Sequence, residues 1–220
     1  MARSKNGLFG LFIGKIGNLI FSIWKGKQIS RVRPAHLHNP NTPAQNRERS
    51  KFKILTKFIS ENHEIFKIGF ITFSKQMHTA NAAYKYNCKT AVAGTYPNQY
   101  IDVTKLTLSY GKLLPLEELK ATPALNNTIT VNWTDNSFSN SKASAQDNVI
   151  ISVFDETSGK SKTFFDAGRR GDETANLPLD SKWAGCSVSV YAFVVKDNVS
   201  GRSMKPIHIS NSVAISGIAL

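Results

Sequence analysis

Three groups of residues have a type and spacing that could support chemistry, and the first is a glycine–lysine segment near the N-terminus. Gly10, Gly14 and Lys15 occur together in the sequence GLFIGK. A phosphate-binding loop needs four residues between its glycines and a Ser or Thr after the lysine, because its amides and hydroxyl hold the phosphate and its metal. Here three residues separate the glycines, and Ile16 follows the lysine. The segment therefore predicts tight turns or close backbone packing rather than a nucleotide site.

Histidine and cysteine form the second group. His36 and His38 could place two imidazoles on one side of an extended segment, but a metal would need at least one further ligand and no acidic or cysteine partner lies nearby. We interpret them as exposed linker residues and predict no metal site. Cys88 and Cys186 lie far apart without a CxxC or Cys/His pattern, which predicts buried thiols rather than a bridge or ligands.

Acidic pairs form the third group. They are Glu117-Glu118, Asp155-Glu156 and Asp172-Glu173. Paired carboxylates can act as general acid and base when the fold brings them together, yet all three pairs lie in apparent turns, where solvated side chains explain them. The sequence also has no nucleophile elbow, zinc-binding helix or kinase-type motif. We therefore predict no catalytic residues, no cofactor and a protein that is not an enzyme.

Positive charge is the remaining feature, and it is concentrated at one end of the chain. Residues 1–60 hold 12 Lys and Arg against the single acid Glu48, whereas residues 121–220 hold nine of each sign; the net charge is +13. Such a charge split predicts an anionic partner for the N-terminal end. The candidate anion-binding or partner-binding residues are Lys15, Lys25, Lys27, Arg31, Arg33, Arg47, Arg49, Lys51, Lys53 and Lys57.

Two interpretations of these basic residues remain open. If the N-terminal strands fold against the first helix, the residues can line one surface, and phosphate contacts would give strong, salt-dependent, sequence-indifferent binding. Trp24 can add base stacking, although aromatic residues at strand or helix spacing more often belong to a core. The alternative is a solvated basic face without a partner, and charge alone does not separate the two.

A hairpin, a connector and a helix must position the basic residues. Residues 19–24 alternate as in a strand, Lys25-Gly26-Lys27 suits a turn, and residues 28–32 resume an extended pattern. Prolines and asparagines over residues 34–43 predict an extended connector. Thr42 and Gln45 have the spacing of a capping box, so a helix should begin at Pro43.

Further helices should follow. Phe52, Leu55 and Ile59 recur at helical spacing, with the basic residues on other faces. Asn62-His63 can interrupt this helix, after which Ile65, Phe66, Phe70 and Phe73 form a second apolar group. Residues 75–86 predict another short helix with a face of Ala80, Ala83 and Tyr84, and residues 101–113 predict a strand.

From about residue 115 the composition predicts an antiparallel sandwich. Short strands with turn signals between them are typical of this class. The predicted strands are residues 128–134, 148–155, 162–166, 186–196 and 212–217, with a hairpin turn over 155–159. The fold class is therefore an α+β N-terminal module with a β-hairpin and helices, followed by an all-β sandwich. The predicted domains are residues 1–115 and 116–220.

The N-terminus resembles a signal peptide only superficially. Lys15 divides the apolar run, Gly7, Gly10, Gly14 and Gly17 weaken any helix, and KGK follows Trp24 in place of a cleavage site. We expect no signal peptide and no membrane span. A virion or the cytoplasm is the favoured location.

Two resemblances add to these observations. The series Asn39-Pro40-x-Thr42-Pro43-Ala44-Gln45-x-x-x-Arg49-x-x-Phe52, with the Gly, Trp and Arg positions before it, resembles an uncharacterised family of bacterial and phage-encoded proteins. Its NPxTPAQxxxRxxF part is also similar to a segment of phage virion proteins. Residues 116–218, with Trp133 on an early strand, resemble fibronectin type III or immunoglobulin-like domains.

These resemblances imply a function. We expect a non-enzymatic structural component of a virion or phage-like assembly, which contacts other protein subunits through its basic module and displays the sandwich. The alternative is a nucleic-acid-binding protein that contacts phosphates through the same module.

Overall fold

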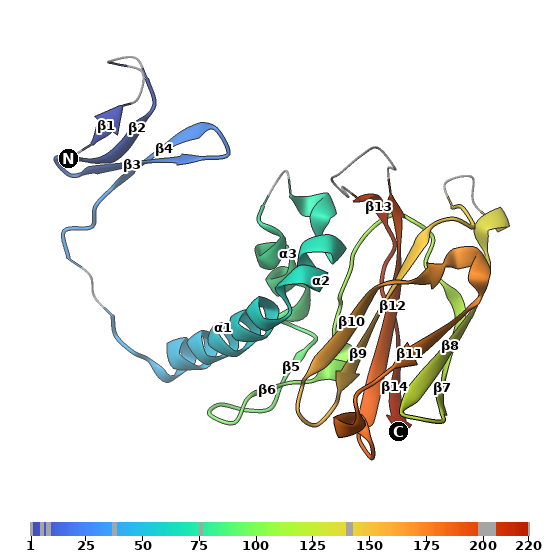
Figure 1. Ribbon diagram of the computed structural model, residues 1–220. Helices are drawn as coiled ribbons and strands as arrows, with labels where there is room; N and C mark the ends of the chain where they lie inside the picture. The colour runs from blue at the N-terminus through green and yellow to red at the C-terminus, as the bar shows by residue number, and fades with distance from the viewer. Residues whose placement is uncertain are drawn as a thin grey trace. The chain divides into compact units, whose positions relative to one another are not determined.

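The residues that the computed structural model describes are 2–4, 7, 10–36, 39–74, 77–139, 143–197 and 206–219. They show an α+β protein with antiparallel sheets (Figure 1), which confirms the fold class at that level. The chain divides into two units, Met1–Thr42 and Pro43–Leu220. Each unit is described by itself.

The first unit is a small antiparallel sheet with the strand order β1-β2-β3-β4. Its strands are β1 (Arg3–Ser4), β2 (Phe12–Ile16), β3 (Leu19–Trp24) and β4 (Lys27–Val32). The predicted hairpin is confirmed, because β3 pairs with β4 from Leu19↔Val32 to Trp24↔Lys27. Lys25 (φ 49°) and Gly26 (φ 79°) form the two-residue turn. Positive φ at both positions matches the strand twist and favours glycine.

The second unit begins with three helices. They are α1 (Pro43–Glu61), α2 (His63–Gly69) and α3 (Thr79–Asn87), with a 3-10 turn η2 (Ile71–Phe73) between the last two. The predicted start at Pro43 and the interruption at Asn62 are both confirmed.

Two details of the predicted helix faces were wrong. Phe52 is 55% exposed and contacts the Tyr84 ring at 5.2 Å instead of entering the core. In α3 the buried residues are Ala82, Ala83 and Asn87, while Ala80 is exposed. Residues 75 and 76 of the predicted third helix lie outside the described part of the chain.

Two sheets follow the helices, joined to them through short strands β5 (Val92–Ala93) and β6 (Tyr100–Ile101) and the turn η3 (Val103–Lys105). One sheet has the order β11-β8-β7, and the other has the order β10-β9-β12-β13, with β14 also paired to β12. The strands are β7 (Glu117–Ala124), β8 (Thr128–Thr134), β9 (Asn148–Asp155), β10 (Ser161–Arg169), β11 (Thr174–Pro178), β12 (Ser187–Asp197), β13 (Pro206–Ile209) and β14 (Val213–Ala219). Short 3-10 turns connect some of them, namely η4 (Ser137–Ser139), η5 (Arg170–Asp172) and η6 (Ser181–Trp183).

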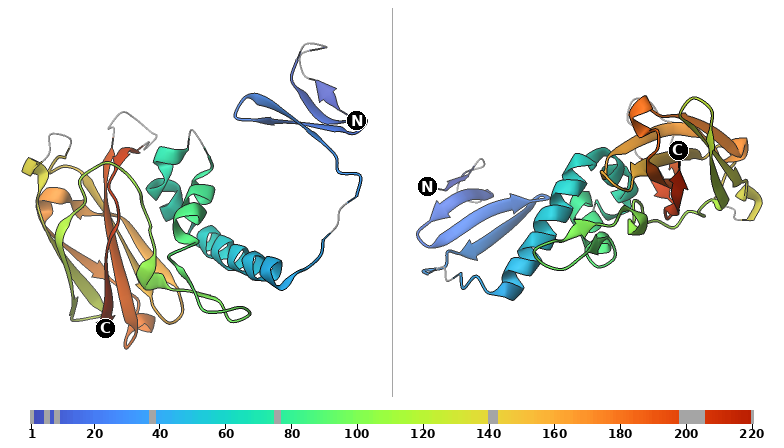
Figure 2. Two further views of the ribbon diagram at one scale, coloured as in Figure 1. Left: turned by 180° about the vertical axis from the view of Figure 1, so that it is seen from behind. Right: turned by 90° about the horizontal axis from the view of Figure 1, so that it is seen from below.

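The larger sheet is buried on both faces. In β12, Val188, Val190, Ala192 and Val194 pack against the smaller sheet, whereas the alternate residues Tyr191, Phe193 and Val195 pack against the helices. All residues of β9 are buried for the same reason. Figures 1 and 2 show the helices on one side of this sheet and β7, β8 and β11 on the other. The second unit therefore has three layers and two apolar cores.

This packing moves the boundary between the parts of the chain. We predicted a division at residue 115, but the structure divides the chain after Thr42. The physical reason is that Leu55, Phe58 and Phe66 from the helices share one core with Phe154, Tyr191 and Phe193 from the sheet. The helices thus belong with the sandwich and not with the hairpin.

The predicted strand over residues 101–113 was wrong for residues 102–112, while Leu113 forms an isolated parallel bridge with Ser210. Residues 106–112 have no strand partner, and polar side chains satisfy several of their backbone amides. The amide of Leu106 donates to Tyr191 Oη at 3.0 Å, that of Thr107 to Asn87 Oδ1 at 2.8 Å, and that of Leu108 to Ser212 Oγ at 3.2 Å. Burial raises the pKa of Tyr191 to about 12, so its hydroxyl stays protonated and donates to the Val103 carbonyl at 2.7 Å.

A buried arginine joins several loops at one end of the sandwich. Arg170 is fully buried, and its Nε lies 3.6 Å from Asp147 Oδ2. Its terminal nitrogens donate to Asn136 Oδ1 and, at 2.9 Å, to the Leu114 carbonyl. Burial lowers the pKa of Arg170, while the nearby carboxylates, chiefly Asp147, oppose that effect. The cation stays charged because arginine starts from so high a pKa.

Among the described residues, none of the helices has the length and apolar character needed to cross a bilayer.

Candidate functional site

The N-terminal sheet places its charged side chains on one face. Directly paired residues of neighbouring strands point to the same side, and residues alternate along each strand. The register pairs Lys15 with Ile20, Ile20 with Arg31, and Trp24 with Lys27. Arg3 pairs with Ile13 and so points to the same side. Arg33 lies two positions after Arg31 and points there as well. We call this side of the sheet the cationic face. Its basic residues are Arg3, Lys15, Lys27, Arg31 and Arg33.

The opposite face is apolar. Leu19 pairs with both Ile16 and Val32 there, and the Phe12 and Phe21 rings lie 5.9 Å apart. No Asp, Glu, Lys or Arg of the described strands points to this side. The residues of this apolar face are Phe12, Ile16, Leu19, Phe21, Ile23 and Val32.

Gln28 is the main polar side chain on the apolar side, and it serves the backbone. Its Oε1 accepts from the Phe12 amide at 2.8 Å, and its Nε2 donates to the Phe12 carbonyl at 3.0 Å. The carboxamide thus acts like a short strand partner where β2 separates from β3. Because these polar atoms bond the Phe12 backbone, the rest of this face remains apolar.

The sheet has no interior of its own. None of the described residues in 2–36 and 39–42 is buried, and Ile16, Leu19, Ile23 and Val32 count among the exposed large apolar side chains. Apolar side chains that remain in water forgo the stabilisation that burial gives. Exposed contiguous apolar surface of this kind marks an interaction site.

The other predicted basic residues lie on α1. Arg47 and Lys51 share the carboxylate of Glu48, at 3.4 Å and 3.0 Å, and Lys57 lies 3.8 Å from Glu61. The hydrogen bond from Lys51 and the positive charges of both neighbours lower the pKa of Glu48. Arg49 contacts Asn46 Oδ1 at 3.5 Å, and Lys53 is exposed.

The ten predicted residues therefore fall into two groups. Lys15, Lys27, Arg31 and Arg33 share the cationic face, and Lys25 lies in the turn with its Nζ 5.1 Å from the Trp24 ring. The other five belong to α1 in the second unit. Arg3 was missed, because a strand as short as β1 has no periodicity that could reveal which face it occupies.

The acidic pairs act as acceptors within turns and strands. Asp155 accepts from Thr157 N at 2.8 Å, and the two carboxylate oxygens of Glu156 accept from Ser187 and Ser189 at 2.8 Å and 2.7 Å. Asp172 accepts from Arg169 N at 2.6 Å. These bonds make the carboxylates part of the local structure.

The described residues contain no cluster of three or more His, Cys, Asp or Glu side chains that could hold a metal ion. His36 is exposed, while His38 lies outside the described residues. Cys88 and Cys186 are free thiols and half-buried, not buried as predicted. The structure therefore leaves the N-terminal sheet as the most distinctive candidate site.

Comparison with known proteins gives one match. The model of a family of unknown function (DUF6266) matches residues 11–213. No curated protein and no solved structure matches the chain. The match spans the N-terminal sheet from β2 onward, the helices and most of the sandwich.

Proposed function

The chain belongs to the DUF6266 family of unknown function, and we propose that it is a non-enzymatic structural component of a virion or phage-like assembly. In this proposal the apolar face of the N-terminal sheet docks onto other protein subunits. The second unit, which has its own cores, remains displayed. The observation that carries the proposal is a sheet without a single buried residue among those described.

Burial energetics support a docking role. Covering one large apolar side chain stabilises a structure by about 1.5–3 kcal/mol, and the apolar face offers six of them. Docking onto another subunit would remove these side chains from water and so stabilise the bound sheet. An uncharged face suits a protein surface better than an anion, since interface centres are depleted in charge.

The choice of a virion or phage-like particle rests on sequence resemblance. The segment over residues 39–52 carries it, and this segment contains the start of α1. Membership of an uncharacterised family agrees with the resemblance at that level.

We further propose that the sandwich is of the fibronectin type III or immunoglobulin-like kind. The smaller sheet contains β7, β8 and β11. The larger sheet contains β9, β10 and β12, and both β13 and β14 pair with β12. Trp133 is buried between the sheets on the second strand. Sandwiches of this type present their edges and loops to partners.

Replacing Leu19 by aspartate is expected to release the protein from its assembly. Leu19 lies on the apolar face and is 41% exposed, so a buried carboxylate there would cost several kcal/mol on docking. Co-sedimentation with native particles should fall at least tenfold. Ile29→Asp is the matched control, since Ile29 is 43% exposed but lies on the cationic face.

Two results would contradict the docking proposal. One is a wild-type protein that never co-sediments with an assembled particle. The other is an equal loss for Leu19→Asp and Ile29→Asp, because the effect would then not depend on the apolar face.

Nucleic-acid binding is the second candidate, favoured by the gathering of Lys15, Lys27, Arg31 and Arg33 on one face. Residues 1–47 contain no acid, and Trp24 lies on the same side as these cations. Cationic surfaces of this kind bind phosphates without sequence preference, and an aromatic ring adds base stacking.

The double variant Lys15→Gln/Arg31→Gln tests this candidate. The two residues flank Ile20 in one row across the sheet. If both residues contact phosphates of duplex DNA, a plot of the logarithm of the binding constant against the logarithm of the salt concentration should be less steep than for wild type, by about 1.8. Lys67→Gln/Lys89→Gln, two exposed lysines of the second unit, is the control. Binding of wild-type protein that does not respond to salt would exclude the candidate.

A further inference from the structure

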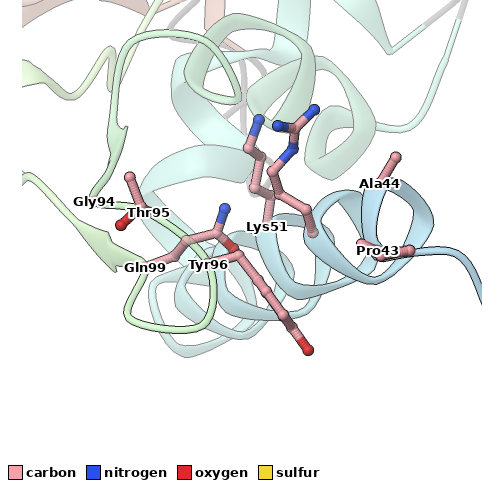
Figure 3. A pocket seen from close by; sticks show the side chains of 8 residues that line it. Pro43, Ala44, Lys51, Gly94, Thr95, Tyr96 and Gln99 are labelled. Carbon is pink, nitrogen blue, oxygen red and sulfur yellow. The ribbon is translucent and has the colours of Figure 1, made fainter.

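A cavity of about 530 Å³ lies between the N-terminal turns of α1 and the loop after β5. Its lining comes from the second unit alone. Pro43, Ala44, Arg47 and Lys51 form the helical wall, and Gly94, Thr95, Tyr96 and Gln99 form the loop wall. Figure 3 shows Lys51 rising from the helix on one side, with Thr95, Tyr96 and Gln99 on the other. The volume lies in the range of small-molecule sites.

Gln99 provides a buried polar group without a partner. The residue is only 9% exposed, and its Oε1 accepts no hydrogen bond from the residues the structure describes. A buried acceptor left unsatisfied is unfavourable, and native proteins rarely retain one without a reason. The Oε1 atom itself is covered, but the residue lines the cavity. A rotation of the carboxamide about its terminal bond would turn Oε1 toward the cavity, where a hydrogen-bond donor on a bound molecule can supply the missing bond.

The helical wall carries net positive charge. Arg47 and Lys51 are one turn apart, so they project from the same face of α1. Within the described part of the chain, Glu48 is the acid paired with them, through Arg47 Nε and Lys51 Nζ. The 19-residue helix also directs the positive end of its dipole toward Pro43 and Ala44. An anionic group, and phosphate above all, is favoured at this wall.

The loop wall provides a flat aromatic surface in a defined position. Tyr96 is 47% exposed and lines the cavity. Gly94 fixes the loop: its φ is +80°, and a Cβ there would lie 2.4 Å from the Asn98 carbonyl oxygen. Aromatic side chains held in this way stack on nucleobases, whose ring faces are all similar.

We propose that this cavity binds a nucleoside monophosphate unit, either a free nucleotide or the 5′-phosphorylated end of a strand. The phosphate lies against Arg47, Lys51 and the start of α1, the base stacks on Tyr96, and an N–H or O–H of the nucleoside donates to Gln99. The site is independent of the N-terminal sheet and of the docking role proposed for it.

Calorimetric titration of the full-length protein tests the assignment. Adenosine 5′-monophosphate should bind at least tenfold more tightly than adenosine or inorganic phosphate alone, since each of these lacks one half of the contacts. A 5′-phosphorylated oligonucleotide that binds as well as the free nucleotide assigns the site to strand ends. If the oligonucleotide binds much more weakly than the free nucleotide, the cavity is a site for free nucleotides.

Three variants separate the contacts. Lys51→Met and Tyr96→Leu should each weaken nucleotide binding about tenfold, through lost charge and lost stacking. Gln99→Met removes the unpaired Oε1 acceptor and keeps the side-chain volume nearly unchanged. The variant should stay folded and should bind the nucleotide more weakly. Lys67→Met, at an exposed position outside the cavity lining, should leave nucleotide binding unchanged. The proposal is overturned if phosphate alone binds as tightly as the nucleotide, if no nucleotide binds, or if Lys67→Met weakens binding as much as Lys51→Met.

Discussion

Residues 43–220 are expected to fold without the N-terminal sheet, whereas residues 116–220 alone are expected not to fold cooperatively. Without the helices, one face of the larger sheet would lose its cover. The residues exposed would be Ile150, Phe154, Tyr191, Phe193, Val195 and Ile209. Six large side chains represent about 9–18 kcal/mol of burial at about 1.5–3 kcal/mol each, which is comparable to the whole stability of a domain at about 5–15 kcal/mol.

Thermal unfolding followed by near-UV and far-UV circular dichroism distinguishes the two fragments. The 43–220 fragment should melt in one transition at the temperature of the same transition in the full chain. The 116–220 fragment should show no sharp transition and should aggregate. A soluble 116–220 fragment with an unchanged midpoint would mean that the helices add little to the sandwich.

Arg170→Met is expected to destabilise the second unit by about 3–5 kcal/mol, because it leaves the Asp147 carboxylate buried without its cation. The Asn136 side chain and the Leu114 carbonyl also lose their donors. Chemical denaturation should therefore show a large decrease in the free energy of unfolding. Arg49→Met, at an exposed position on α1, should stay within about 0.5 kcal/mol of wild type.

A second substitution identifies the cause. Asp147→Asn added to Arg170→Met should recover part of the lost stability, because the unpaired charge is gone. If the double variant is as unstable as the sum of the two single variants, the loss comes from packing and not from the ion pair.

Local patterns predicted elements whose signals lie within a few residues. The turn at Lys25-Gly26 and the helix start at Pro43 depend on backbone conformations that glycine and proline favour. β8 and β9 have the predicted bounds. Their runs of β-branched and apolar residues end at turns, so the limits could be read from the chain itself.

Strands that depend on distant partners were missed. β7 contains Pro123, which an edge strand tolerates, and β11 (Thr174–Pro178) is short and has little β-forming composition. Both pair with β8, and this partner provides what their own sequences lack. β13 was missed as well, and it owes its place to pairing with the end of β12.

The candidate site was predicted in part. The basic residues of the N-terminal end could be found from composition, and alternation placed Arg31 and Arg33 on one side. Arg31 and Arg33 lie on the same face as Lys15 and Arg3 because of the register between the strands. The sequence of a single strand does not determine that register. The cavity at Gln99 was not predicted, since it joins a helix to a loop some fifty residues later in the chain.

The sequence by itself determined where the charge lies, where the first hairpin turns and where α1 begins, because these properties depend on neighbouring residues. Only the tertiary structure decided that the helices join the sandwich rather than the hairpin. The alternating side chains of β9 and β12 are apolar on both faces, and such strands become stable only between two covering layers. Which segments supply those layers is a matter of long-range packing. The same packing leaves the N-terminal sheet with an apolar face that its own chain segment does not bury.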